Sequence, residues 1–177
     1  MKKSVSSLLI LIHAPILLFG QSDGLPRAFP LEMETLLYHG TYVKITYTRA
    51  SAATLNLENG MLWQLGTNEP AELMTTGDLL VGKDTLAAGA YSIFSIPNDS
   101  TWTFIVNKDV GLFGTYRYNE IMDLFRIEAA ILPEDSYHEH LEISFSRKGV
   151  PDTDLIIYWK KIKLSIPVRL LEKEEIK

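Results

Sequence analysis

The chain has 177 residues, of which 46% are apolar and 22% are charged, a balance typical of one ordinary globular domain. A chain of this length buries roughly 70% of its unfolded surface, so it needs neither a metal nor a disulfide to hold its core. It contains no cysteine. Acidic residues outnumber basic residues by 22 to 17, and this balance argues against nucleic acid as a partner, because nucleic-acid binding depends on neutralising phosphates with Lys and Arg.

The first twenty residues have the pattern of a bacterial export signal. Lys2 and Lys3 precede an apolar run over residues 8–19, and the small residue Gly20 precedes the expected cleavage near Gln21. The run is about a dozen residues long, whereas a membrane-spanning helix needs roughly 20, so we expect removal of the signal and no stable membrane insertion. Removing two lysines leaves 15 basic and 22 acidic residues, a net charge of −7. The sequence predicts a periplasmic or secreted protein.

The rest of the chain alternates apolar and polar residues with a period of two, as β-strands with one buried face do. Short turn signals separate the runs, which favours antiparallel hairpins, and over residues 79–107 they predict three consecutive antiparallel strands. The sequence predicts an all-β fold, an antiparallel β-sandwich or jelly roll. We expect eight or nine strands, among them residues 42–49, 79–81, 85–87, 91–96, 101–107, 124–131, 141–145, 154–160 and 163–168.

Helix is expected only as a short segment over residues 31–37, and residues 51–66 lack a clean period, which predicts a long loop. Long loops on a rigid sandwich often carry binding residues. The expected division of the chain is a signal peptide at 1–20, an N-terminal segment at 21–40, a sandwich domain at 41–168 and a charged tail at 169–177.

Two motifs resemble ligand sites but lack required parts. Residues 77–84 are close to a phosphate-binding loop, yet Asp84 stands where the motif needs a Ser or Thr hydroxyl and would repel phosphate, and a further strand follows in place of a helix. His138 and His140 offer two imidazoles on one face of a strand, with Asp135 and Glu142 nearby, but the polar start of a strand explains the same residues. We expect no cofactor and no metal.

The most informative stretch is residues 63–69, Trp-Gln-Leu-Gly-Thr-Asn-Glu, which gathers an aromatic ring, amides and a carboxylate around a glycine. Such a stretch lines a polar pocket or fixes a loop to the sandwich through hydrogen bonds from side chains to the backbone. Composition leaves both interpretations open.

A series of motifs together resembles the bacterial domain-of-unknown-function family 2911. They are Tyr47-Thr48-Arg49, residues 63–69, Gly82-Lys83, residues 86–97 with their Ala-Gly-x-Tyr-Ser-x-Phe-x-Ile-Pro run, Trp102-Thr103, Asn107, and Asp123 with Arg126. The resemblance covers about residues 40–167 and implies an exported β-sandwich protein with no assigned activity. Where the family usually has Trp-Arg-Thr-Gly-Ala-Asn-Glu, this chain has Gln64, Leu65 and Thr67, so it lacks the arginine that would hold an anionic ligand.

A complete sandwich pattern without a catalytic motif favours a non-catalytic binding or interaction module of the bacterial cell envelope, with a small molecule or an envelope protein as its partner. One alternative is a hydrolase or isomerase in which Glu69 is the general base and Asn68 or Arg49 stabilises charge. Another is a carbohydrate-associated jelly roll, which requires exposed aromatic side chains on a concave face. We expect Arg49 and Glu69 to lie near each other at one end of the sandwich. The candidate binding residues are Tyr47, Arg49, Trp63, Asn68 and Glu69.

Overall fold

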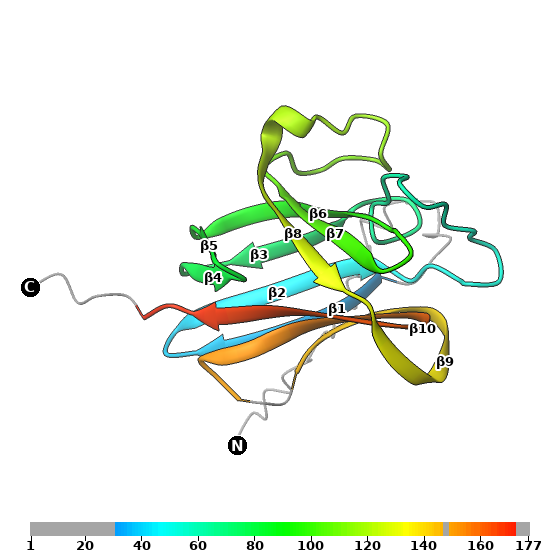
Figure 1. The fold of residues 1–177 in the computed structure, drawn as a ribbon. Coiled ribbons are helices and arrows are strands. Elements are labelled where there is room, and N and C mark those ends of the chain that lie inside the picture. The colour runs from blue at the N-terminus through cyan, green and yellow to red at the C-terminus, as the bar shows by residue number, and fades with distance from the viewer. Residues whose placement is uncertain (1–30, 147–148, 173–177) are drawn as a thin grey trace, which may run out of the picture.

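The computed structural model describes residues 31–146 and 149–172, so the expected export signal lies outside the described residues. These residues form two antiparallel sheets that pack against each other (Figure 1). The strand order is β1-β2-β3-β6-β7-β8 in the six-stranded sheet and β5-β4-β10-β9 in the four-stranded sheet. The all-β sandwich predicted from the sequence is confirmed, with ten strands in the described part of the chain in place of eight or nine.

The six-stranded sheet contains β1 (Leu31–Tyr38), β2 (Thr41–Thr48), β3 (Ala71–Thr75), β6 (Gly89–Ile96), β7 (Thr101–Asn107) and β8 (Asp123–Ala130). The four-stranded sheet contains β4 (Leu79–Val81), β5 (Asp84–Leu86), β9 (Leu132–Phe145) and β10 (Asp152–Leu170). One turn of 3-10 helix, η1 (Glu120–Met122), precedes β8. Among the described residues no helix is long and apolar enough to cross a membrane.

Strand β1 corrects the short helix expected over residues 31–37. It pairs with β2 through a two-residue turn in which His39 and Gly40 both have positive φ angles, 45° and 81°. Two successive positive φ values define the tight turn whose twist matches that of the flanking strands. The sheet accordingly begins at Leu31, inside the segment that was expected to precede the sandwich.

Two further details of strand order differ from expectation. Residues 154–160 and 163–168 belong to one long strand, β10, which is irregular at Lys160, where φ is 55° and the register with β9 shifts. A β-bulge of this kind bends a strand without ending it. Strands β5 and β6, expected to be neighbours in one antiparallel series, lie in different sheets.

The core between the sheets centres on three tryptophans. The ring of Trp63 meets Trp102 edge-on at 5.9 Å and lies 5.2 Å from Trp159, measured between ring centroids. Edge-on and tilted arrangements are the favoured geometries for aromatic pairs. Because Trp63 belongs to the connection between β2 and β3, this cluster also fixes that connection to the sandwich.

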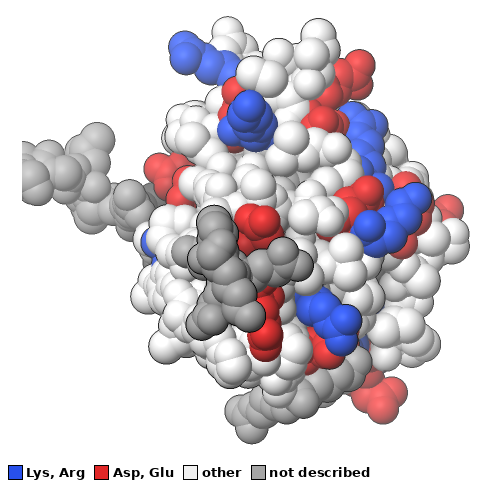
Figure 2. Space-filling view, turned by 90° about the vertical axis from the view of Figure 1, so that its left-hand side faces the viewer, with Lys and Arg blue, Asp and Glu red and all other residues white. Residues whose placement is uncertain are grey.

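The surface carries charges of both signs. On the face shown in Figure 2, Lys and Arg side chains are interspersed with Asp and Glu, and they form no continuous basic area there. That face therefore lacks the electrostatic pattern of a nucleic-acid-binding surface.

Candidate functional site

The long loop between β2 and β3, residues 49–70, is anchored to the sandwich at two points (Figure 1, right). Ser51 forms an isolated bridge with β9, and Trp63 forms another with Ser95 of β6. The Trp63 side chain is buried, and its Nε1–H donates a hydrogen bond of 3.0 Å to the carbonyl oxygen of Gly66. The loop expected from the irregular sequence pattern is confirmed, and its course is fixed by backbone pairing and by a buried ring.

Between these anchors the loop surrounds a hollow of about 410 Å³, which we call the loop hollow. This volume lies within the range of small-molecule sites, which are lined mainly by apolar side chains with a few polar groups. Glu58 is the one charged residue in the lining. The apolar part of the lining comes chiefly from Leu55, Leu57, Met61, Leu62 and Trp63.

Gln64 provides a polar group in the wall of the loop hollow. Its amide nitrogen donates a hydrogen bond of 3.0 Å to the carbonyl oxygen of Thr67, and its amide oxygen has no donor among the described residues. Glu58, which is exposed, adds a carboxylate that also accepts hydrogen bonds. Gln64 and Glu58 therefore accept hydrogen bonds from a ligand, the amide of Asn56 in the same lining can donate one, and the charge of Glu58 disfavours a carboxylate.

Arg49 and Glu69, which were expected to lie near each other, form no ion pair among the described residues. The guanidinium of Arg49 lies 3.8 Å from the carboxylate of Glu32, which the unexpected strand β1 brings beside β2. The two loop ends are close, because the hydroxyl of Thr67 donates to the carbonyl oxygen of Arg49 at 3.4 Å. Glu69 itself is exposed and lines a different hollow. The alternative with Glu69 as general base therefore gains no support from an ion pair with Arg49, and Asn68 is the other residue expected to stabilise charge.

Other sequence-predicted site residues have structural contacts. Tyr47 is buried, and its hydroxyl accepts a hydrogen bond of 3.1 Å from the backbone N–H of Ile143 in the opposite sheet. The backbone carbonyl of Asn68 accepts a hydrogen bond from the N–H of Gly114. Trp63 and Trp102 are both buried, so neither offers the exposed ring that the carbohydrate alternative required.

His138 and His140, which were considered as metal ligands, contact other residues of the protein. The ring of His138 stacks on Tyr158 with centroids 4.5 Å apart, and its Nδ1 lies 3.2 Å from the carboxylate of Glu142. The backbone of His140 pairs with Ser51 of the loop. Within the described ranges, no three His, Asp or Glu side chains gather in a way that could hold a metal ion.

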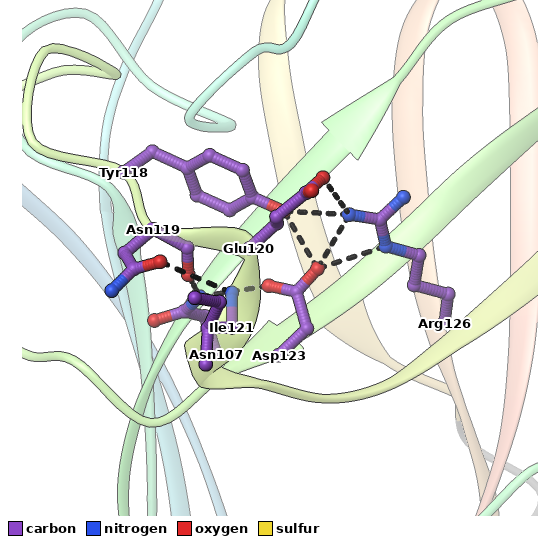
Figure 3. Close-up of polar contacts among 7 residues, drawn as sticks. All are labelled: Asn107, Tyr118, Asn119, Glu120, Ile121, Asp123 and Arg126. Carbon is purple, nitrogen blue, oxygen red and sulfur yellow. Dashed lines mark hydrogen bonds and ion pairs between the residues drawn. The ribbon is translucent and has the colours of Figure 1, made fainter.

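A buried carboxylate at the start of β8 organises a polar cluster (Figure 3). Asp123, whose side chain is 8% exposed, accepts hydrogen bonds from Asn107 Nδ2 at 2.7 Å and from Tyr118 Oη at 2.6 Å. Arg126 Nε donates to the same carboxylate at 2.8 Å. We call these four residues the polar cluster. The family resemblance had pointed to Asn107, Asp123 and Arg126. It did not include Tyr118, which lies in the loop between β7 and β8.

The polar cluster fixes the loop of residues 108–122 to strands β7 and β8. Burial, followed by the hydrogen bond to Asp123, raises the pKa of Tyr118 to about 12. At neutral pH the phenol therefore stays protonated and donates a hydrogen bond to Asp123. Tyr118 thus has a structural role and is not a general base. The ring of Tyr118 also packs edge-on against Phe94 with centroids 4.9 Å apart.

The fold and its sites define an antiparallel β-sandwich domain with a ligand-sized hollow in a long connecting loop. The chain belongs to the family described as protein of unknown function (DUF2911), which matches residues 32–168. No curated protein matches the chain, and no solved structure matches it. The family resemblance identified in the sequence is confirmed.

Proposed function

We propose that this protein is a non-catalytic binding module of the bacterial cell envelope and that its loop hollow binds a small, neutral, mainly apolar molecule. The observation that carries the proposal is the loop hollow itself, about 410 Å³ with an apolar lining and a free amide oxygen on Gln64. A loop fixed to a rigid sandwich at Ser51 and Trp63 is a common setting for a binding site.

The lining sets the chemistry of the ligand. Leu57, Met61 and Leu62 offer apolar surface that suits a ring compound. A hydroxyl or N–H group on that ring finds an acceptor in Gln64, whereas a carboxylate meets the like charge of Glu58. Neutral ring compounds with one hydrogen-bond donor fit these conditions best.

Thermal denaturation of the exported protein with indole, phenol and benzoate tests this proposal. A ligand that binds only the folded state raises the melting temperature by mass action. We expect indole and phenol to raise it and benzoate, which has the ring but no donor at neutral pH, to raise it much less. A benzoate effect as large as that of phenol would contradict the proposed chemistry.

A pair of matched variants locates the site. Met61 lines the loop hollow and Met33 lies on β1, and the two are equally exposed at 59% and 58%. We expect Met61→Arg to abolish the stabilisation by phenol, because it places a long cation in the wall, and Met33→Arg to preserve it. Full stabilisation of Met61→Arg by phenol would place the ligand elsewhere.

The proposed envelope location rests on the signal pattern of residues 1–20. We expect the exported protein to begin near Gln21, and N-terminal sequencing of the exported form measures this. Finding Met1 retained on a membrane-bound form would contradict the location and leave the ligand chemistry unaffected.

A further inference from the structure

A second hollow, of about 240 Å³, lies on the outer face of the six-stranded sheet, and we call it the outer hollow. Thr46, Glu72 and Ser92 all line it and lie directly opposite one another across β2, β3 and β6. Residues that are directly paired in neighbouring strands point to the same face of the sheet. Glu69, which precedes β3, adds a second carboxylate to the same hollow.

Four polar side chains of the outer hollow, those of Thr46, Glu69, Glu72 and Ser92, lack partners within the described part of the chain, whereas the hydroxyls of Tyr47 and Thr48 already accept hydrogen bonds from backbone N–H groups. Glu69 and Glu72 form no ion pair or side-chain hydrogen bond there, and the guanidinium of Arg49 is engaged by Glu32. Ser92 is only 2% exposed, yet its hydroxyl makes no hydrogen bond with any described residue. A buried hydroxyl is normally hydrogen-bonded, because leaving it unpaired costs free energy. Because Ser92 lines the outer hollow, a ligand there can supply the partner of its hydroxyl.

We propose that the outer hollow binds an organic ammonium group. An ammonium group has donors and no acceptor, and the hollow offers two carboxylates and two hydroxyls that accept. The carboxylates of Glu69 and Glu72 neutralise its charge, and the hydroxyls of Thr46 and Ser92 accept N–H bonds. No lysine or arginine lines the hollow to compete for them.

The apolar part of the wall distinguishes an organic cation from a metal ion. Leu31, Pro70 and Leu112 line the outer hollow beside the carboxylates. A calcium ion takes six to eight oxygen ligands and gains nothing from apolar walls, whereas the carbon stem of an alkylammonium buries against them. This site is separate from the loop hollow, because the two share no lining residue.

The polar cluster holds one side of the outer hollow in place. Asn107, a member of that cluster, is paired directly with Ser92 across β6 and β7. The loop that Asp123 and Tyr118 fix also supplies Gly111 and Leu112 to the wall. Because this part of the wall is already fixed before the ligand binds, binding costs less free energy for ordering the wall.

Titration calorimetry of the protein with n-butylammonium chloride tests the proposal, with n-butanol and sodium butyrate as probes of the same size. We expect heat of binding only with n-butylammonium and a lower affinity at high salt, since exposed carboxylates are screened. Calcium chloride is the fourth probe. Equal binding of n-butanol, or stronger binding of calcium, would overturn the proposal.

Three variants make the test specific. We expect Glu72→Gln to weaken n-butylammonium binding by about tenfold or more, because it removes a charge-assisted hydrogen bond. Glu34→Gln removes an equal charge from an exposed position on β1 and serves as the control. Ser92→Ala is expected to weaken binding without lowering the melting temperature, because its hydroxyl has no protein partner to lose. Unchanged affinity in Glu72→Gln, or a destabilised Ser92→Ala protein, would contradict the assignment.

Discussion

The carboxylate of Asp123 accepts hydrogen bonds from three side chains, which gives it a structural role. Its carboxylate is nearly buried and accepts from Asn107, Tyr118 and Arg126. Replacing Asp123 with Asn removes the charge and leaves Arg126 facing a neutral group, so we expect a loss of about 2–3 kcal/mol in the free energy of unfolding. Urea denaturation measures it.

Glu120 provides the matched control for that prediction. It also faces Arg126, at 3.6 Å, but its side chain is 76% exposed. An exposed ion pair contributes about 0–1 kcal/mol, so Glu120→Gln is expected to leave the unfolding free energy nearly unchanged. Equal losses for Asp123→Asn and Glu120→Gln would show that burial of the carboxylate does not matter.

Tyr118 gives the protein a predictable response to alkali. Its pKa rises from 10.0 to about 12 on folding, so between these values the folded chain holds a proton that the unfolded chain has lost. The free energy of unfolding therefore falls as pH rises through this window, and the contribution is fully present below pH 10. Denaturant unfolding at several alkaline pH values is expected to show a shallower decline in Tyr118→Phe than in the parent protein. An identical decline in both would contradict the shift.

The residues expected to bind a ligand show what a sequence can assign. Trp63 was identified by residue type and Tyr47 through the family resemblance, and their hydrogen bonds run to Gly66 and Ile143, inside the structure. Aromatic residues with a polar atom satisfy it in the core as readily as in a site. The same stretch did contain Gln64, whose free amide oxygen becomes visible only once its contact with Thr67 is known.

Among the elements, the hairpin of β1 and β2 depends most clearly on its turn. Gly40 has φ +81° and nothing lies within 4 Å of the position that a Cβ would take. Gly40→Ala therefore tests backbone strain without a steric clash, and we expect it to cost about 1–2 kcal/mol of unfolding free energy. Thr35→Ala on exposed β1 is the control, with a smaller loss expected. Thermal unfolding of both variants checks this, and equal losses would show that the turn conformation is not the cause.

The alternation of apolar and polar residues predicted the strands that have one buried and one more exposed face. It did not predict a strand that has no buried face. Strand β2 alternates between buried and half-buried residues, as its sequence does. Strand β1 is an edge strand that is exposed along most of its length, and the alternation of Leu31–Glu34 ends in Thr-Leu-Leu-Tyr, so no period-two pattern runs through the whole strand. The bulge at Lys160 needs a positive φ angle that no residue type signals there, and β10 was consequently expected as two strands.

At the scale of the whole molecule, one hydrogen bond joins the two sheets through the core. The hydroxyl of Tyr47 on β2 accepts from the backbone N–H of Ile143 on β9. Tyr47→Phe leaves that buried N–H without an acceptor, which is expected to cost about 1–3 kcal/mol. Hydrogen exchange is expected to show faster exchange of the Ile143 amide in the variant. Unaltered protection would mean that the N–H finds another partner.

The two hollows differ in how far a sequence can predict them. The loop hollow is built from one continuous segment, residues 50–67, and the irregular pattern already marked that segment as a loop for binding. The outer hollow joins Thr46, Glu72 and Ser92 from three strands, and their alignment depends on the register of two strand pairs. A shift of one residue in either pair would turn a side chain to the other face, so sequence spacing could not bring them together.

The proposed binding activity is tested most directly by a two-dimensional amide NMR titration of the protein with phenol. If the loop hollow is the site, the signals of Leu57, Met61 and Gln64 and the indole N–H signal of Trp63 shift and saturate together. The signals of Glu72 and Ser92 in the outer hollow serve as the internal control and stay in place. Shifts confined to the outer hollow, or no saturable shift anywhere, would contradict the account.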